Sequence, residues 1–206
     1  VGRQAQPGGV EDRLEGVRTT AELLSAGLSA GRIRRLVRDG ALYPLRPGVY
    51  ATAATVTSLV RDPRDERARQ AGDQLLRLAA TLAVTGSRSA GSHRSAARVH
   101  GLGLVGRGSE PATEITRAPG GGGGHANRLG ALGHIAALPA DHVVSYRGVP
   151  LTSVPRTVID LARTLPFAEG VAVADSALHG GLTSKGALSA VIADCPRWRG
   201  CSGPAT

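Results

Sequence analysis

Four arginines lie between Gly31 and Gly40, a segment whose only acidic residue is Asp39. A guanidinium group binds phosphate, or the edge of guanine, through two parallel hydrogen bonds, so a dense arginine cluster suits nucleic acid. An arginine-rich segment can also be the solvated face of a helix. The four residues are Arg32, Arg34, Arg35 and Arg38.

A second chemistry is hydrolysis by Ser92, His93 or His100, with Asp160 or Asp175 as the acidic partner. A nucleophile needs a base within reach and a third group that orients the base, and here the candidates are scattered along the chain. Ser92 is more simply explained as a helix cap. We therefore predict that the protein is not an enzyme.

Metal chemistry has little support in the sequence. Cys195 and Cys201 lie six residues apart in a tail rich in proline and glycine, which is not the spacing of a zinc site. The carboxylates of the second half are dispersed, whereas a nuclease holds its metal ion with clustered ones. They are Asp141, Asp160, Glu169, Asp175 and Asp194. We predict no metal, no cofactor and no nuclease activity.

The residues before the arginine cluster predict how it is positioned. Thr19 and Glu22 have the spacing of a capping box, which begins a helix. Gly27 suits a sharp turn after that helix, and Ser29 can cap a second helix. In the second helix Ile33, Leu36 and Val37 form one apolar stripe, and the four arginines fall outside it.

The residues after the cluster predict a short β-hairpin over 41–51, with Pro44, Pro47 and Gly48 as turn residues. Two helices followed by a hairpin form a winged helix-turn-helix, in which the second helix reads the major groove. Tyr43 and Arg46 would then reach a flanking phosphate or the minor groove. The predicted partner is double-stranded DNA.

The amino-acid composition restricts the class of protein but does not indicate a function. The 206 residues carry 25 Lys+Arg against 16 Asp+Glu, and every basic residue except Lys185 is arginine. Such a bias also arises from G+C-rich coding sequence, so net charge alone is weak evidence for nucleic acid. The sequence has no apolar run of membrane-spanning length and no leader-like start, which predicts a soluble cytoplasmic protein with no membrane partner.

The predicted fold class is α+β, with an N-terminal winged helix-turn-helix followed by a mixed, mainly helical domain with a few short strands. We expect a polar arm (1–15), the winged domain (16–52), a connector (53–65), the second domain (66–195) and a disordered tail (196–206). Helical periodicity predicts helices over 66–84, 92–102, 153–163, 167–179 and 184–193. Short strands are expected over 114–117, 135–138 and 142–146, and a flexible loop at Gly120–Gly124.

Arg156 and Asp160 lie four residues apart in the helix expected after Ser153. At this spacing they form an ion pair, which contributes a few tenths of a kcal/mol if exposed and more if buried. Because they belong to no recognisable catalytic set, we predict that their role is structural.

Several short motifs together resemble the AbiEi-type antitoxin family of type IV toxin–antitoxin systems, in particular its actinobacterial winged-helix proteins. The resemblance covers about residues 16–195. The motifs are Thr20-Ala-Glu-Leu with Gly27-Leu-Ser, Gly40-Ala-Leu, Arg46-Pro-Gly-Val-Tyr50, Ser92-His-Arg-Ser-Ala-Ala97, His100-Gly-Leu102, Gly148-Val-Pro-Leu-Thr152, Arg156-Thr-Val-Ile-Asp-Leu161 and Ala174-Asp-Ser-Ala-Leu178.

The resemblance implies a DNA-binding transcriptional regulator or antitoxin. Two alternatives stay open: a protein-interaction module that antagonises a nucleotidyltransferase-like toxin, and a truncated remnant of a fusion to a C-terminal very-short-patch-repair-like endonuclease, which many similar proteins carry and this sequence lacks. Residues 84–91 are more polar than the buried strand of the family, which predicts loose packing of the second domain. The oligomeric state is not predicted.

Overall fold

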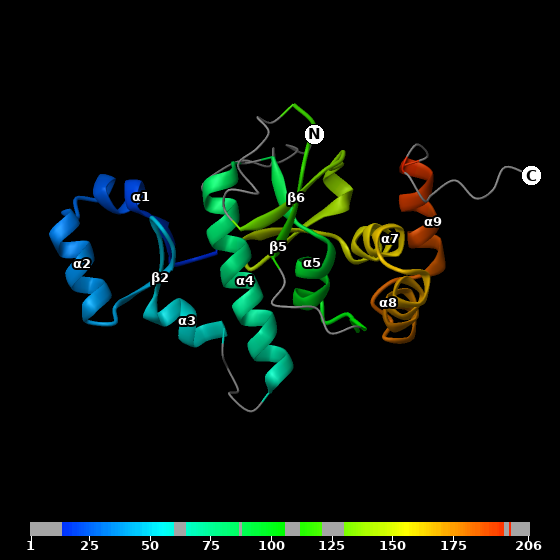
Figure 1. Ribbon diagram of the computed structural model, residues 1–206, viewed down its shortest axis with the longest axis horizontal. Helices are drawn as coiled ribbons and strands as arrows, with labels where there is room; N and C mark the ends of the chain where they lie inside the picture. The colour runs from blue at the N-terminus through cyan, green and yellow to red at the C-terminus, as the bar shows by residue number, and fades with distance from the viewer. Residues whose placement is uncertain are drawn as a thin grey trace, which may run out of the picture.

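The computed structural model describes residues 14–59, 65–86, 88–105, 112–120, 130–195 and 198. Helices and strands are mixed throughout, which confirms the α+β fold class. Two sheets are separated by the long helix α4 (Glu66–Thr85), with the N-terminal elements on one side and the second domain on the other (Figure 1).

The N-terminal domain contains the predicted helix, turn, helix and hairpin. Its elements are β1 (Val17–Thr19), α1 (Thr20–Ser25), α2 (Ala30–Arg38), β2 (Leu42–Arg46) and β3 (Val49–Thr52). The strands form an antiparallel sheet in the order β1-β3-β2. The strand β1 was not predicted, because three residues are too short to display an alternating pattern.

Local hydrogen bonds explain where these helices begin. Thr19 and Glu22 form the predicted capping box at the start of α1. Gly27 has a φ of 87°, so the turn after α1 uses the left-handed conformation that glycine adopts without strain. The Thr20 amide donates to the Gly48 carbonyl over 2.8 Å, which joins the start of α1 to the turn of the hairpin.

The connector predicted over 53–65 is partly wrong, because Ala53–Leu59 is a helix, α3. Residues 60–64 lie outside the described part. This short segment was not recognised as a helix because Thr, Ser and Val have low helix propensity. Its Val56 and Leu59 pack on the core. Gly72 of α4 makes the contact possible, since a β-carbon there would lie 2.9 Å from the Leu59 carbonyl oxygen.

The second domain is built on a five-stranded sheet in the order β6-β5-β4-β8-β7. The strands are β4 (Ser89–Gly91), β5 (Thr113–Arg117), β6 (Ala131–Ile135), β7 (Val143–Tyr146) and β8 (Val149–Thr152). β5 runs parallel to β6, and β4 runs parallel to β8, while the β4–β5 and β7–β8 pairs are antiparallel. A 3₁₀ turn (Ala140–His142) precedes β7.

Further helices of the described residues are α5 (His93–Val99), α7 (Val154–Thr164), α8 (Phe167–His179) and α9 (Lys185–Asp194). The helix α5 packs on the sheet, α7 packs on α5, and α8 and α9 pack on α7. These agree with the predicted helices to within a few residues. Ser92 and Ser153 occupy N-cap positions but make no side-chain cap bond, so their expected role as caps is wrong.

Three other expectations differ from the structure. Residues 89–91 form the fully buried central strand β4, so the loose packing expected there is wrong. Its small residues let neighbours approach closely, since a β-carbon at Gly91 would lie 2.7 Å from the side chains of Leu78 and Leu151. The strand expected over 135–138 lies earlier, at Ala131–Ile135. Trp198, in the tail expected to be disordered, donates its amide to the Cys195 carbonyl. Gly121–Gly124 and the rest of the tail lie outside the described residues.

One hydrophobic core joins the two halves of the chain. Val17, Val49 and Leu59 from the N-terminal side pack in the same cluster as Leu75 and Leu78 of α4, and this cluster continues to the second sheet. A smaller core lies among α5, α7 and α8, and another lies within the helix-turn-helix. The N-terminal domain is therefore held against α4 by buried apolar contacts.

Candidate nucleic-acid interface

The helix α2 has one side fixed in a core. Ser29 caps it by accepting from the Arg32 amide over 3.2 Å. Ile33 is buried in a cluster with Leu23 of α1 and Leu42 of β2, and Leu36 and Val37 pack against that cluster. The apolar stripe predicted from the sequence is thus the side that contacts the domain, which sets the rotation of the helix about its own axis.

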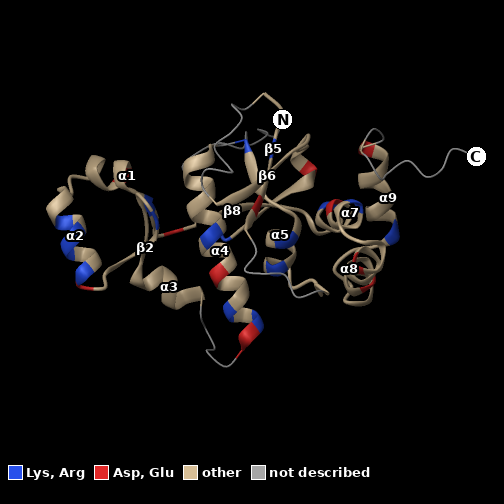
Figure 2. Ribbon diagram, viewed as in Figure 1, with Lys and Arg blue, Asp and Glu red and all other residues tan. Residues whose placement is uncertain are grey.

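The four arginines lie on the remaining, exposed surface of α2. Arg32, Arg34, Arg35 and Arg38 are all exposed. Within the described residues no side-chain hydrogen bond or ion pair holds any of them. Figure 2 shows the basic residues along α2, at the end of the molecule farthest from α9. Their hydrogen-bond donors remain available to an external polyanion.

The hairpin β2–β3, which we call the wing, follows α2 directly. A register shift between Pro44 and Arg46 bends its first strand, and Gly48 in the turn has a φ of 78°. Tyr43 is 45 % exposed. Its role at the flank of a DNA site stays a prediction.

Arg46 does not lie where its predicted contact with flanking DNA would place it. Its Nη1 donates to Thr81 Oγ1 of α4 over 3.1 Å, and the residue is only partly exposed. The prediction that Arg46 reaches outward to DNA does not match this contact. In this structure the guanidinium of Arg46 links the wing to the second half of the molecule, a contact that sequence patterns could not reveal.

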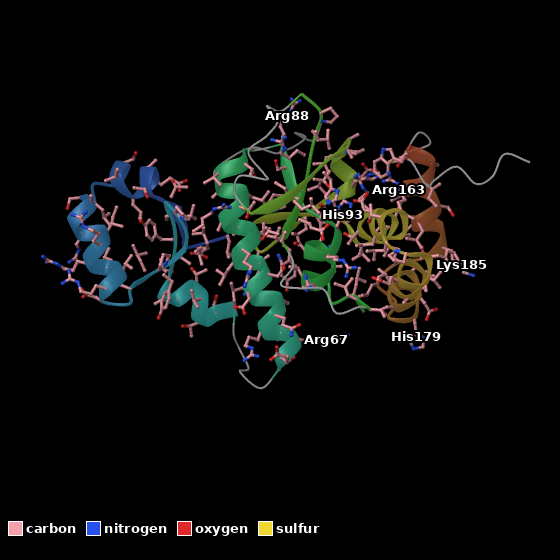
Figure 3. The ribbon with its side chains drawn as sticks, in the orientation of Figure 1. Arg67, Arg88, His93, Arg163, His179 and Lys185 are labelled. Atoms are coloured by element: carbon pink, nitrogen blue, oxygen red, sulfur yellow. The ribbon has the colours of Figure 1, made fainter. Side chains whose placement is uncertain are left out.

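The residues considered for hydrolysis do not form an accessible set. Ser92 Oγ and His93 Nδ1 share a hydrogen bond of 3.0 Å, but Ser92 is fully buried. Burial lowers the pKa of His93 to about 3, and the charges of His134, Arg156 and Arg163 act in the same direction. His93 is therefore neutral at physiological pH, inside the second domain (Figure 3).

The other three hydrolysis candidates are occupied or remote. His100 Nε2 bonds to the Thr152 carbonyl over 2.8 Å, and burial lowers the pKa of His100. Asp160 accepts from Arg156 Nε over 2.9 Å, which places the predicted pair in contact inside the protein. Asp175 is exposed on α8. No nucleophile, base and acid from this set come together.

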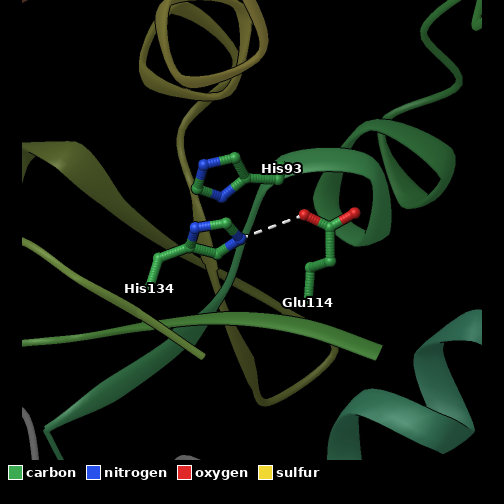
Figure 4. A group of neighbouring side chains, drawn as sticks. All are labelled: His93, Glu114 and His134. Carbon is green, nitrogen blue, oxygen red and sulfur yellow. Dashed lines mark hydrogen bonds and ion pairs between the residues drawn. The ribbon is translucent and has the colours of Figure 1, made fainter. Parts of the chain in front are cut away.

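Two clusters of metal-ligating residue types were missed by sequence reasoning. His93, Glu114 and His134 meet in the second domain, and their ligand atoms lie within 4.8 Å of one another (Figure 4). Asp141, His142 and Asp194 form a similar group, so the expectation that the carboxylates are dispersed is wrong for Asp141 and Asp194. The members are separated by twenty or more residues in most cases, a spacing that matches no local motif.

The N-terminal segment that contains α2 and the wing is similar to a known protein family. Residues 13–53 match the family model described as "Transcriptional regulator, AbiEi antitoxin". The match ends at the first residue of α3 and contains all of α1, α2 and the wing. The resemblance to AbiEi antitoxins is thereby confirmed over the helix-turn-helix and its hairpin. A comparison with curated proteins found no match.

Membrane insertion has no support in the helices described here. None of them is both long enough and apolar enough to cross a bilayer.

Proposed function

We propose that the protein is a DNA-binding transcriptional regulator of the antitoxin type, which binds duplex DNA through α2 and the wing. The observation that carries the proposal is the set of four exposed arginines, which have no side-chain partner in the described part of the chain, on a helix fixed by its apolar side. The same segment matches a family of regulators. A positively charged helix followed by a hairpin is the arrangement that places side chains in a major groove and at its flank.

In the proposed complex α2 lies in the major groove. Arg32, Arg34, Arg35 and Arg38 divide base and phosphate contacts among them, and Tyr43 contacts the flanking backbone. Arg46, on the wing, supports it by its contact with Thr81 of α4. If three or four arginines neutralise phosphates, the logarithm of affinity falls with the logarithm of salt concentration at a slope of about −3 to −4 per protein chain, from about −0.9 per phosphate.

The test is a salt titration of binding to DNA from the region upstream of the protein's own gene. Wild type is compared with Arg35→Ala and Arg38→Ala. Loss of a base contact costs about 1–3 kcal/mol and relaxes specificity at one position, whereas loss of a phosphate contact weakens all sequences and lowers the slope by about 1.

Lys185→Ala is the matched control, because Lys185 is an exposed cation on α9, at the opposite end of the molecule (Figure 3). Arg163 is unsuitable as a distal control, since its Nη1 lies 3.6 Å from Asp160 Oδ1. Equal binding by wild type, both α2 variants and the control would rule out α2 as the recognition helix.

A second candidate function is the binding of a nucleotidyltransferase-like toxin by the second domain. One observation favours a protein contact there: Phe167 is 86 % exposed at the start of α8, and Val171, one turn later, is 49 % exposed. Exposed apolar side chains on one helix face are typical of interaction sites. The test is co-purification with a toxin encoded by the adjacent gene, which Phe167→Ser should abolish without changing DNA binding.

A further inference from the structure

Three potential metal ligands converge in the second domain from three different elements. His93 is the first residue of α5, Glu114 lies on β5, and His134 lies on β6. Glu114 and His134 are brought together because Thr116 pairs with His134 in the parallel β5–β6 ladder and Glu114 lies two residues before Thr116, on the same face. His134 Nε2 donates to Glu114 Oε2 over 3.1 Å.

The cluster is polar where packing alone would favour apolar side chains. The rings of His93 and His134 are stacked, with centroids 3.5 Å apart and planes 16° apart (Figure 4). Buried charges in proteins are paired or coordinate metals, and Glu114 retains only 10 % of its side-chain exposure. His93 also has a φ of +47°, a left-handed conformation that costs energy for a residue with a β-carbon.

We propose that His93, Glu114 and His134 bind a divalent first-row transition-metal ion such as Zn²⁺. Two imidazoles and one carboxylate are a ligand set for such ions, whereas Mg²⁺ and Ca²⁺ take oxygen ligands. Three protein ligands leave one tetrahedral position for water or another donor. This site is independent of the proposed DNA contact, since it lies on the other side of α4 from α2.

Binding requires a rotation of one ring. In a tetrahedral site with bonds of about 2.1 Å the ligand atoms are about 3.4 Å apart, and the lone pairs must converge. Nearly parallel stacked rings do not converge. His134 is the ring that can turn, because it lies on the edge strand β6 with a quarter of its side chain exposed. His93 is held in orientation by Ser92.

The nearby charges permit a cation. Arg156 and Arg163 are the cations whose field reaches His93, and both lie against the carboxylate of Asp160, at 2.9 and 3.6 Å. Their charge is therefore partly compensated, and Glu114 adds a negative charge at the site itself. The exposed part of His134 also gives the ion a path from solvent.

The second cluster, around His142, differs in a way that provides an internal comparison. Arg156 Nη1 donates to His142 Nδ1 over 3.3 Å, and His142 Nε2 donates to Asp194 Oδ2 over 3.2 Å. Both ring nitrogens are thereby used, so His142 has no lone pair to offer. Hydrogen bonding explains that cluster without a metal.

The experiment uses tag-free, full-length protein stripped with a chelator. Co²⁺ is titrated in while its visible d–d absorption is recorded, then Zn²⁺ is added, and the same titration is repeated in excess Mg²⁺. We expect one Co²⁺ per chain in a nitrogen and oxygen environment, displaced by Zn²⁺ and not by Mg²⁺. A thiolate-to-cobalt charge-transfer band would show that cysteine binds the ion instead and would overturn the proposal.

Variants locate the site. Glu114→Gln and His134→Gln should each weaken Co²⁺ binding by about tenfold or more, because even groups around the ligands change affinity by about that factor. His179→Gln and Asp194→Asn are controls at exposed residues and should bind as wild type does. Absence of a Co²⁺ spectrum with wild type, or wild-type affinity in the double variant Glu114→Gln/His134→Gln, would disprove the site.

Thermal melting gives a second readout. Zn²⁺ should raise the Tm of wild type and of His179→Gln, since a ligand that binds only the folded state stabilises it. It should raise the Tm of Glu114→Gln by less, because that variant binds the ion more weakly, and a rise equal to that of wild type would contradict the site. If Glu114→Gln does not fold, His134→Gln locates the site instead, because His134 lies on the edge strand β6 with a quarter of its side chain exposed.

Discussion

The arginines of α2 and Arg156 of α7 are the same residue type in opposite environments. Those of α2 are exposed and have no described partner. Arg156 is fully buried and donates to Asp160, to the Ala137 carbonyl and to His142, while its guanidinium carbon lies 4.0 Å from the centroid of the Trp198 ring. The arginines of α2 can therefore bind an external anion, whereas Arg156 has internal partners for most of its hydrogen-bond donors.

The role of an arginine depends on what surrounds its guanidinium. A buried ion pair loses its hydration, so removal of one partner leaves an uncompensated charge inside the protein. An exposed arginine is hydrated in the free protein, and its removal costs little stability. Stability should therefore respond strongly to changes around Arg156 and weakly to changes on α2, with DNA binding responding in the opposite order.

The largest expected effect is at Asp160. Asp160→Ala leaves Arg156 buried without its carboxylate, which should lower the free energy of unfolding by about 3–5 kcal/mol. Urea denaturation followed by circular dichroism measures the change. The matched control is Glu66→Ala, since Glu66 pairs with Arg69 on the exposed side of α4 and should cost less than about 1 kcal/mol. If Asp160→Ala and Glu66→Ala lowered the free energy of unfolding equally, the contrast between the buried and the exposed ion pair would be wrong.

Trp198→Ala should have the next largest effect. The ring lies over Arg156 and also over Arg163, at 4.0 and 4.5 Å, and a cation–π contact of a desolvated guanidinium is worth up to about 2 kcal/mol. Arg156 Nη2 is buried and has no hydrogen-bond partner among the described residues. Trp198→Phe should recover part of the loss in the same denaturation experiment. An unchanged midpoint in Trp198→Ala would mean that the contact does not contribute.

A smaller effect is expected at the cap of α2. Ser29→Ala removes the acceptor of the Arg32 amide and should cost about 1 kcal/mol. Because the cap also fixes the start of the proposed recognition helix, DNA affinity should fall modestly as well, whereas Ser184→Ala, the same change at the start of α9, should affect stability alone. Thermal melting and DNA-binding isotherms are measured for both variants. If Ser29→Ala and Ser184→Ala bind DNA equally well, the cap of α2 does not contribute to DNA recognition.

The smallest effect on stability is expected at Arg34 or Arg38. Substitution by alanine should change the free energy of unfolding by less than about 0.5 kcal/mol, because neither side chain has a partner to lose. Differential scanning calorimetry of Arg38→Ala beside Lys185→Ala measures this. A large drop in Tm for Arg38→Ala alone would show that α2 relies on its arginines for folding and would weaken the comparison.

The sequence indicated the helix-turn-helix closely because its signals are local. The capping box of Thr19 and Glu22, the glycine turn and the apolar stripe around Ile33 all act within one or two helical turns. The Arg156–Asp160 contact was predictable for the same reason, since both residues lie in one helix. The burial of that pair was not, because it depends on Ala137, His142 and Trp198, which are remote in the chain.

Tertiary structure alone decided which polar residues of different elements meet. The contact of Arg46 with Thr81 spans 35 residues, and His93, Glu114 and His134 come from a helix and two strands. Periodicity reports the environment of a residue relative to its own element and carries no information on which other element packs there. The sequence thus determined the element and face on which each arginine of α2 lies. The three-dimensional fold determined that Arg46 and Arg156 turn inward and that two histidines stack beside a carboxylate.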